Sequence, residues 1–158
     1  MEKFERLGMS KELITALRQF GFKEPSEIQE KAIPLALAGK DIIGGSATGT
    51  GKTLVFASPI IENLIPNNHV QALILTPTRE LAEQIMNTLK KFADKKPLNI
   101  LAVYGGVDIN GQINKIPKAD IIAGTPGRIL DHLNRRTLNL KHVKVLVLDE
   151  ADRMFDMG

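Results

Sequence analysis

The chain has 158 residues, of which 43% are hydrophobic and 25% charged, a composition that excludes wholesale disorder and fits a single globular domain. It contains no cysteine, which excludes a disulfide framework and any thiolate zinc site, and it has no apolar run long enough to span a membrane. The net charge of +3 permits a polyanionic partner without requiring one. We therefore expect a cytoplasmic protein, or a nuclear one if its source is eukaryotic.

Two helices are expected near the amino terminus. Ser10 can cap the first, whose apolar residues follow helical spacing, and Gly21 can end it. A second helix is predicted to run to about Leu37. Ser26 and Gln29 stand three residues apart, as in a capping box, and the residues alone favour that structural role for Gln29.

A loop of small residues follows a strand predicted at 41–44 and precedes a helix that Pro59 is expected to disturb. Its backbone N–H groups can converge on an anion, and the helix N-terminus adds further donors. Lys52 would neutralise the outer phosphates and Thr53 would hold a magnesium ion. A glycine-rich turn without a ligand is the alternative, because Ser46 replaces the first glycine of the pattern G-x-x-x-x-G-K-[ST]. The predicted phosphate loop comprises Ser46, Ala47, Thr48, Gly49, Thr50, Gly51, Lys52 and Thr53.

Short apolar runs predict further strands at 70–75, 99–104, 120–124 and 143–148. Helical patterns separate them, and the helix after Thr125 is expected to turn Ile129, Leu130 and Leu133 inward. Strands that alternate with helices predict an α/β fold, with a parallel sheet covered by helices on both faces. Ligands of such sheets lie at the carboxyl ends of the strands, where all of the suggestive loops of this chain fall.

Two carboxylates, Asp149 and Glu150, directly follow the last predicted strand. A magnesium ion bound to nucleotide phosphates would stabilise their charge at the tip of that strand. Asp149 would hold the ion through water, and Glu150 would orient or deprotonate the attacking water. Alone, the pair also fits a strand that ends in a polar loop. The phosphate loop with Lys52 favours the catalytic interpretation.

The tetrapeptide Asp149-Glu150-Ala151-Asp152 resembles the motif after which the DEAD-box ATP-dependent RNA helicases are named. The whole chain is similar to the first, RecA-like domain of that family. This resemblance implies a P-loop NTPase domain that binds ATP and Mg²⁺ and acts on RNA.

The segment from Phe22 to Gln29 resembles the family's Q motif. The resemblance implies that Phe22 stacks near the adenine of ATP and that Gln29 reads the adenine edge. The chain departs from the usual family pattern at Ser26 and Glu27 of the Q motif and at Ser46 and Ala47 of the phosphate loop.

Three further loops resemble family motifs that grip RNA: motif Ia at 77–82, the GG motif at 105–106 and motif Ib at 125–128. Arginines, threonine hydroxyls and free N–H groups at helix starts suit sugar and phosphate contacts, which carry no sequence information. Helix caps and a sheet turn are the alternative roles. The candidate RNA-binding residues are Pro77, Thr78, Arg79, Gly105, Gly106, Thr125 and Arg128.

By comparison with the family, residues 1–158 are expected to form a RecA-like domain that is truncated after the acidic motif. The second RecA-like domain is absent from the sequence, so we expect weak nucleotide binding and no unwinding. An open slot in the sheet, between strands that end at Gly44 and Asp149, would favour self-association. Two other functions stay open: a non-catalytic module that binds nucleotide or RNA, and a P-loop ATPase that acts on DNA or protein.

Overall fold

The computed structural model describes residues 1–45 and 51–157, which form two compact units. Residues 1–64 and 91–97 make up the first, called here the helical unit, and the second, the sheet unit, comprises residues 65–90 and the chain from Leu98 onward. Within the described ranges, no helix is both long and apolar enough to cross a membrane.

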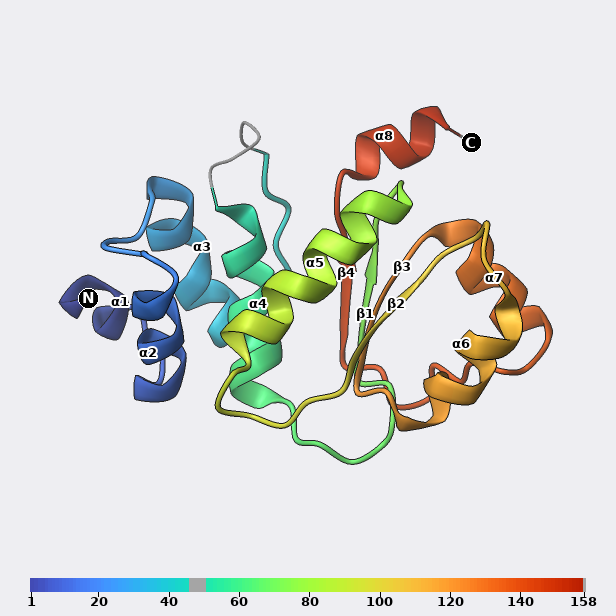
Figure 1. The fold of residues 1–158 in the computed structure, drawn as a ribbon. Helices are drawn as coiled ribbons and strands as arrows, with labels where there is room; N and C mark the ends of the chain where they lie inside the picture. The colour runs from blue at the N-terminus through green and yellow to red at the C-terminus, as the bar shows by residue number, and fades with distance from the viewer. Residues whose placement is uncertain (46–50, 158) are drawn as a thin grey trace. The chain divides into compact units, whose positions relative to one another are not determined.

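The helical unit contains four helices of the described chain, namely α1 (Glu2–Arg6), α2 (Lys11–Gln19), α3 (Glu27–Leu37) and α4 (Lys52–Asn63) (Figure 1). The predicted cap of α2 is confirmed, because the Ser10 side chain accepts a hydrogen bond from the Leu13 N–H at 3.2 Å. The capping box of α3 is also confirmed, with both of its reciprocal bonds present. Pro59 lies inside α4, which continues to Asn63, so the proline does not end the helix.

The strand predicted at 41–44 is not formed. Residues 41–45 carry no regular secondary structure, and the Ile43 side chain is fully exposed. A strand is stable only when its N–H and C=O groups pair with a neighbour, and no described strand pairs with this segment. Residues 41–44 have the hydrophobicity of a strand, but a local pattern cannot show whether a neighbouring strand is there to pair with them.

The sheet unit contains four described strands in the order β2-β3-β1-β4, all parallel. Their bounds are β1 Ala72–Leu75, β2 Ile100–Val103, β3 Ile121–Gly124 and β4 Val145–Leu148. The helices of this part of the chain are α5 (Arg79–Phe92), α6 (Ile109–Lys115), the 3₁₀ helix η1 (Ile116–Lys118), α7 (Pro126–Asn134) and α8 (Ala151–Asp156). Helix α5 lies on one side of the strands, and α6 and α7 lie on the other (Figure 1). The predicted α/β class is therefore confirmed.

The core between the sheet, α7 and η1 contains Leu73, Val103, Ile116, Ile122 and Ile129 among its buried members. Ile129 is 3% exposed as predicted, whereas Leu130 is 58% exposed, so its predicted inward orientation is wrong. Neighbouring residues of a helix point about 100° apart, and only one of this pair can face the sheet.

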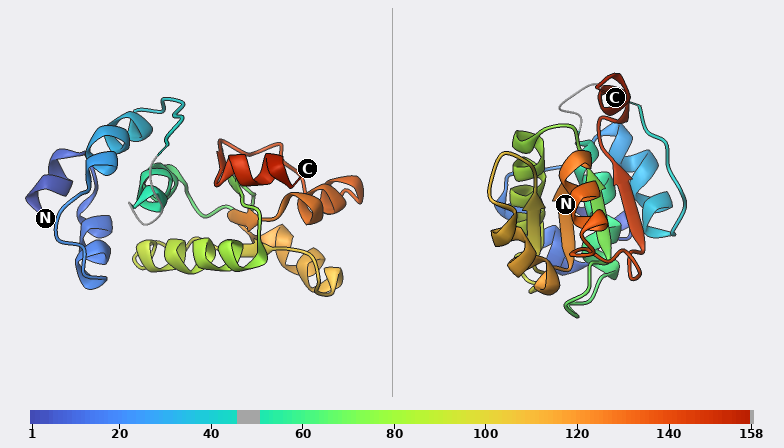
Figure 2. Two further views of the ribbon diagram at one scale, coloured as in Figure 1. Left: turned by 90° about the horizontal axis from the view of Figure 1, so that it is seen from above. Right: turned by 90° about the vertical axis from the view of Figure 1, so that its right-hand side faces the viewer.

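Strand β4 lies at one edge of the sheet, as the right-hand view of Figure 2 shows. Leu146 is in register with Leu73 and lies on the same face as the core, yet it is 60% exposed. Leu148, on the same face, is 51% exposed. Among the residues that the structure describes, β4 pairs with β1 alone, and the strand expected on the other side of the slot is not formed, so the open slot stays a prediction.

A buried carboxylate, Asp120, connects backbone segments at the amino-terminal ends of the strands. Asp120 is fully buried, and its Oδ1 accepts hydrogen bonds from the backbone N–H groups of Asn67 and Asn68 at 3.0 and 3.2 Å. Its Oδ2 accepts a third from the N–H of Asn99 at 2.9 Å. One side chain therefore ties the loop before β1 to the start of β2.

Candidate functional site

Four of the predicted loops meet at one edge of the sheet unit. Because the strands are parallel, their carboxyl ends lie at the same edge, and the strand order places the GG loop, motif Ib, motif Ia and the acidic motif side by side. Backbone bonds continue beyond the strands: Thr76 N–H donates to Gly124 O at 3.0 Å and Asp149 N–H to Leu75 O at 2.9 Å. The structure thus gathers these loops as the sequence predicted.

In motif Ia, Thr78 caps α5, since its Oγ1 accepts a hydrogen bond from the Leu81 N–H at 3.2 Å. Pro77 is buried, whereas Arg79 is exposed. The Arg79 guanidinium carbon lies 4.7 Å from the centroid of the Tyr104 ring, and its Nε lies 4.0 Å from Glu83 Oε1. These contacts orient the arginine along the surface of the sheet edge and leave it accessible.

The GG loop begins with Tyr104, whose hydroxyl donates a short hydrogen bond of 2.5 Å to Glu83 Oε1. This bond, and then partial burial, raises the pKa of Tyr104 above its ordinary value. Gly105 and Gly106 are exposed, and a Cβ on either would meet no atom within 4 Å. Gly106 has φ +81°, a left-handed conformation that other residues adopt only at a cost.

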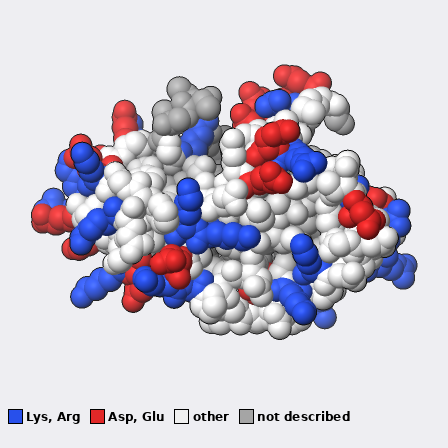
Figure 3. Space-filling model, viewed as in Figure 1, with Lys and Arg blue, Asp and Glu red and all other residues white. Residues whose placement is uncertain are grey.

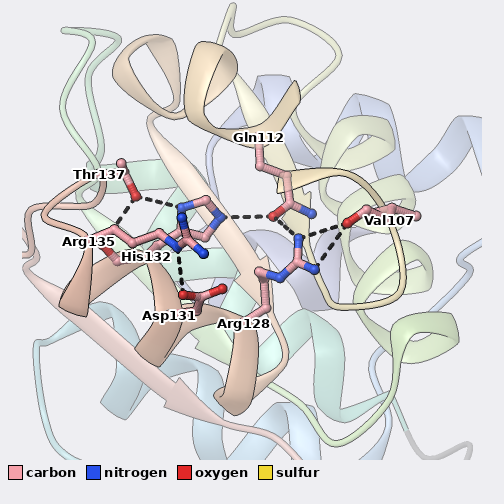
Figure 4. Close-up of polar contacts among 7 residues, drawn as sticks. All are labelled: Val107, Gln112, Arg128, Asp131, His132, Arg135 and Thr137. Carbon is pink, nitrogen blue, oxygen red and sulfur yellow. Dashed lines mark hydrogen bonds and ion pairs between the residues drawn. The ribbon is translucent and has the colours of Figure 1, made fainter. Parts of the chain in front are cut away.

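In motif Ib, Thr125 is the N-cap residue of α7, as predicted, but its side chain makes no capping bond within the described structure. Pro126 occupies the first helical position. Both terminal nitrogens of Arg128 donate to Val107 O at 3.1 Å, and Nη1 also donates to Gln112 Oε1 at 3.1 Å (Figure 4). Arg128 is therefore bonded to the end of the GG loop.

A fully buried histidine completes this cluster. His132 Nε2 lies 2.8 Å from Gln112 Oε1, and its Nδ1 lies 2.7 Å from Thr137 Oγ1 (Figure 4). Burial, and then the positive charge of Arg128, lower the pKa of His132 below its ordinary value of 6.5. The imidazole is consequently neutral at neutral pH.

Asp149 and Glu150 of the acidic motif form the turn between β4 and α8, and Ala151 begins the helix. Glu150 adopts a left-handed conformation with φ 54° and ψ 48°, which costs a non-glycine residue about 1–2 kcal/mol. Its Oε2 is buried with no hydrogen-bond partner within the described structure, although Arg153 Nη1 lies 3.7 Å away. A strained residue with an unsatisfied carboxylate oxygen is typical of a functional site.

The Q motif lies in the helical unit, where Gln29 is 3% exposed. Its Oε1 accepts a hydrogen bond from Ser26 N–H at 2.9 Å, and its Nε2 donates to Gly51 O at 3.2 Å. The capping role is confirmed, and each amide group keeps one further bonding position for a ligand. The Phe22 ring packs edge-on against Phe92, with centroids 5.7 Å apart.

Only part of the phosphate loop falls within the described residues. Ser46, Ala47, Thr48, Gly49 and Thr50 lie outside them. Gly51, with φ +83°, is the N-cap of α4, and a Cβ there would lie 2.1 Å from Gln29 Nε2. Lys52 and Thr53 occupy the first turn of α4, where backbone N–H groups have no partner within the helix.

The described end of the phosphate loop fits a nucleotide phosphate by its chemistry. A left-handed glycine followed by a helix N-terminus is the backbone arrangement that binds phosphate oxygens. Thr53 of the helical unit and Asp149 of the sheet unit each carry an oxygen of the kind that magnesium prefers. Bound magnesium would supply charge stabilisation for phosphoryl transfer.

Charged side chains are interspersed rather than segregated on the face drawn in Figure 3, where lysines and arginines lie beside aspartates and glutamates. Ion pairs such as Lys3–Glu24 and Lys31–Glu27 contribute to this mixing. This distribution agrees with the small net charge of +3. On this face, contact with a polyanion would therefore depend on particular loops.

Sequence reasoning missed Glu83, Tyr104, Gln112 and His132 as parts of the site. Tyr104 directly precedes the glycine pair and is the chain's one tyrosine, which is the only signal that could have drawn attention to it. Gln112 and His132 are polar residues in helical patterns, and nothing in their spacing separates them from solvent-exposed residues.

A parallel α/β sheet whose motif loops share one carboxyl edge defines the chain as a RecA-like domain of the P-loop class. The family model described as "DEAD/DEAH box helicase" matches residues 26–158. The chain therefore belongs to the DEAD/DEAH box helicase family.

Among curated proteins, the chain is 52% identical to the "ATP-dependent RNA helicase CshA" of Listeria monocytogenes, covering 100% of the chain and 31% of the relative. It is 50% identical to the "DEAD-box ATP-dependent RNA helicase CshA" of Geobacillus kaustophilus, covering 100% and 34%. The chain thus spans about a third of the length of these relatives.

Two solved structures are also similar. A DEAD box protein from the hyperthermophile Methanococcus jannaschii has a TM-score of 0.95 and 48% identity, over 99% of this chain and 43% of that one. A hypothetical ATP-dependent RNA helicase from Sulfolobus tokodaii has a TM-score of 0.88 and 38% identity, over 95% and 44%.

Proposed function

We propose that residues 1–158 are the amino-terminal, ATP-binding RecA-like domain of an ATP-dependent RNA helicase. The observation that carries this proposal is the order of the motif loops along one sheet edge in a chain of the DEAD/DEAH box family. The similarity to relatives named as ATP-dependent RNA helicases supports RNA as the substrate and ATP as the nucleotide.

In this proposal the phosphate loop and the Q motif bind ATP. The described end of the loop supports it, because Gly51 presents the start of α4 to an anion and Gln29 holds that glycine in place. Lys52 would neutralise phosphate charge, and Thr53 with Asp149 would hold Mg²⁺. Glu150 would orient or deprotonate the attacking water.

RNA would be held through its sugar-phosphate backbone by motif Ia, the GG loop and motif Ib. The exposed Arg79 and the open Gly105-Gly106 loop support this assignment. Contacts of this kind bind RNA irrespective of its sequence. Hydrolysis at an appreciable rate and duplex unwinding would require a second RecA-like domain to supply arginines to the transferring phosphate, so this chain alone would bind nucleotide weakly and would not unwind.

Competition binding tests the proposal. Labelled ATP on the 158-residue chain should be displaced by ATP and not by GTP, and labelled single-stranded RNA should be displaced by RNA better than by DNA of the same sequence. Equal displacement by GTP would contradict the adenine assignment. Equal displacement by DNA would favour an ATPase that acts on another polymer.

A second experiment tests catalysis by joining the chain to the remaining two thirds of a relative such as the Listeria protein. The joined protein should hydrolyse ATP with RNA stimulation, and Glu150→Gln should abolish turnover while ATP still binds. Asp156→Asn, an exposed change in α8, is the matched control and should keep activity. Turnover that survives Glu150→Gln would contradict the catalytic role of this residue.

A further inference from the structure

Tyr104 joins two of the candidate RNA-binding loops through its two ends. Its hydroxyl bonds to Glu83 of α5, and its ring lies beneath Arg79 of motif Ia. Its backbone oxygen accepts a hydrogen bond from Gln112 Nε2 at 2.9 Å. The residue that starts the GG loop is therefore held from both α5 and α6.

Gln112 continues this connection to motif Ib. Because its Nε2 donates to Tyr104 O, its Oε1 is the acceptor, and it receives hydrogen bonds from Arg128 Nη1 and His132 Nε2 (Figure 4). His132 Nε2 therefore carries the proton of this bond, while Nδ1 lies 2.7 Å from Thr137 Oγ1, which also donates to His132 O at 3.2 Å. Gln112 is 7% exposed, and each of its polar atoms has a partner.

Arg128 closes the connection by bonding to Val107 O, just after the glycine pair. The glycines at 105–106 therefore lie between two anchored carbonyls, Tyr104 O and Val107 O. A loop that is open at its glycines and anchored on both sides keeps its N–H groups in place without covering them.

We propose that Glu83, Tyr104, Gln112 and His132 form a brace that fixes the mutual positions of motif Ia, the GG loop and motif Ib, and that Tyr104 and Gln112 act as positioning residues for RNA. The inference rests on the proposed function for the identity of the ligand. It assigns a role to residues outside the motifs. It also gives Arg128 a second role: the arginine holds the end of the GG loop through Val107 O, in addition to any contact with an RNA phosphate.

Glu83→Ala and Gln112→Ala test the brace, because each removes one anchor of the Tyr104 segment from a different helix. Affinity for a fluorescein-labelled oligouridine of about ten nucleotides, within the range of site sizes seen in single-strand-binding domains, is measured by anisotropy. Each change should weaken RNA binding by about three- to tenfold, as expected for a lost hydrogen bond, while ATP affinity stays within about twofold. Asn114→Ala removes an exposed amide from the same helix as Gln112 and should change neither affinity.

The double variant distinguishes a brace from two independent supports. If both residues act by holding the same loop, the combined loss of RNA affinity should be smaller than the product of the single losses. Independent losses that multiply would overturn the proposal, and so would single variants that bind RNA as the unaltered chain does.

If the unaltered chain binds no RNA, the proposed function is refuted. The brace can then still be tested by a spectroscopic measurement that needs no RNA. Tyr104 is the one tyrosine, and the chain has no tryptophan, so the tyrosine band of the near-ultraviolet circular dichroism spectrum reports on this residue. Gln112 bonds to the backbone oxygen of Tyr104, so Gln112→Ala should change that band, and Asn114→Ala should not. An unchanged band in Gln112→Ala would overturn the brace.

Discussion

Replacing Gly51 by alanine tests how the end of the phosphate loop is held. The residue has φ +83°, and a Cβ would lie 2.1 Å from Gln29 Nε2 and 3.1 Å from Gln29 Cδ. The Gln29 amide would have to move, which breaks its bonds to Gly51 O and to Ser26 N–H. The change therefore combines backbone strain with the loss of two hydrogen bonds of the Gln29 side chain, one of which belongs to the capping box.

The two contributions differ in size. A left-handed conformation costs an alanine about 1–2 kcal/mol. Loss of two hydrogen bonds adds about 1–3 kcal/mol. The free energy of unfolding of Gly51→Ala should therefore fall by about 2–5 kcal/mol.

Gly39→Ala is the matched control, since Gly39 has φ +80° in the same unit but a Cβ there would meet no atom within 4 Å. It should cost the strain alone, about 1–2 kcal/mol. Urea unfolding followed by circular dichroism measures both variants, and ATP binding is measured in parallel. Gly51→Ala should lose at least about tenfold in ATP affinity, whereas Gly39→Ala should lose none. Equal unfolding free energies for the two variants would refute the reasoning.

Three further predictions concern the sheet unit. The pKa of His132 is lowered in the folded chain, so as pH falls below about 6.5 the unfolded chain binds a proton before the folded chain does. The free energy of unfolding should therefore drop by up to about 1.4 kcal/mol per pH unit. This drop should be steeper in the unaltered chain than in His132→Asn. Thr76→Val should be neutral or slightly stabilising in urea unfolding, because the fully buried Thr76 hydroxyl has no hydrogen-bond partner within the described structure. Asp120→Ala should lower the free energy of unfolding by about 3–5 kcal/mol, because three backbone N–H groups lose their acceptor.

Each of these predictions has a contradicting outcome. Parallel pH profiles of the unaltered chain and His132→Asn, measured by urea unfolding from pH 5 to pH 8, would show that His132 does not titrate differently on folding. A loss above about 1 kcal/mol in Thr76→Val would mean that the hydroxyl has a partner in solution. Asp120→Ala with unchanged stability would show that water replaces the carboxylate, and Asp41→Ala, an exposed position, is its control.

Local patterns in the sequence predicted several helix starts in both units and the strands of the sheet unit. Ser10, Ser26 and Thr78 cap helices as expected, because a side-chain oxygen needs only the N–H groups of the next turn. The continuous apolar runs indicated buried parallel strands, and their order along the chain placed the motif loops at one edge.

Features that depend on distant neighbours were not predictable. Residues 41–44 have the hydrophobicity of a strand, but pairing is decided by what lies beside them. The orientation of Leu130 depended on which side of α7 meets the sheet. Gln112 bonds to Tyr104, His132 and Arg128, residues 8, 20 and 16 positions away, and no local pattern carries such contacts.

The hydrogen bonds of Asp120 have a consequence for redesign of the protein. They secure the strands at the end opposite the motif loops, so a change in those loops leaves these bonds in place. Gly105 is the position of the GG loop best suited to exchange, because a Cβ there meets no atom within 4 Å, whereas Gly106 needs its left-handed conformation. A library that varies residue 105 and leaves Gly106 and Asp120 intact should therefore yield folded proteins in which polymer preference changes with little change in stability.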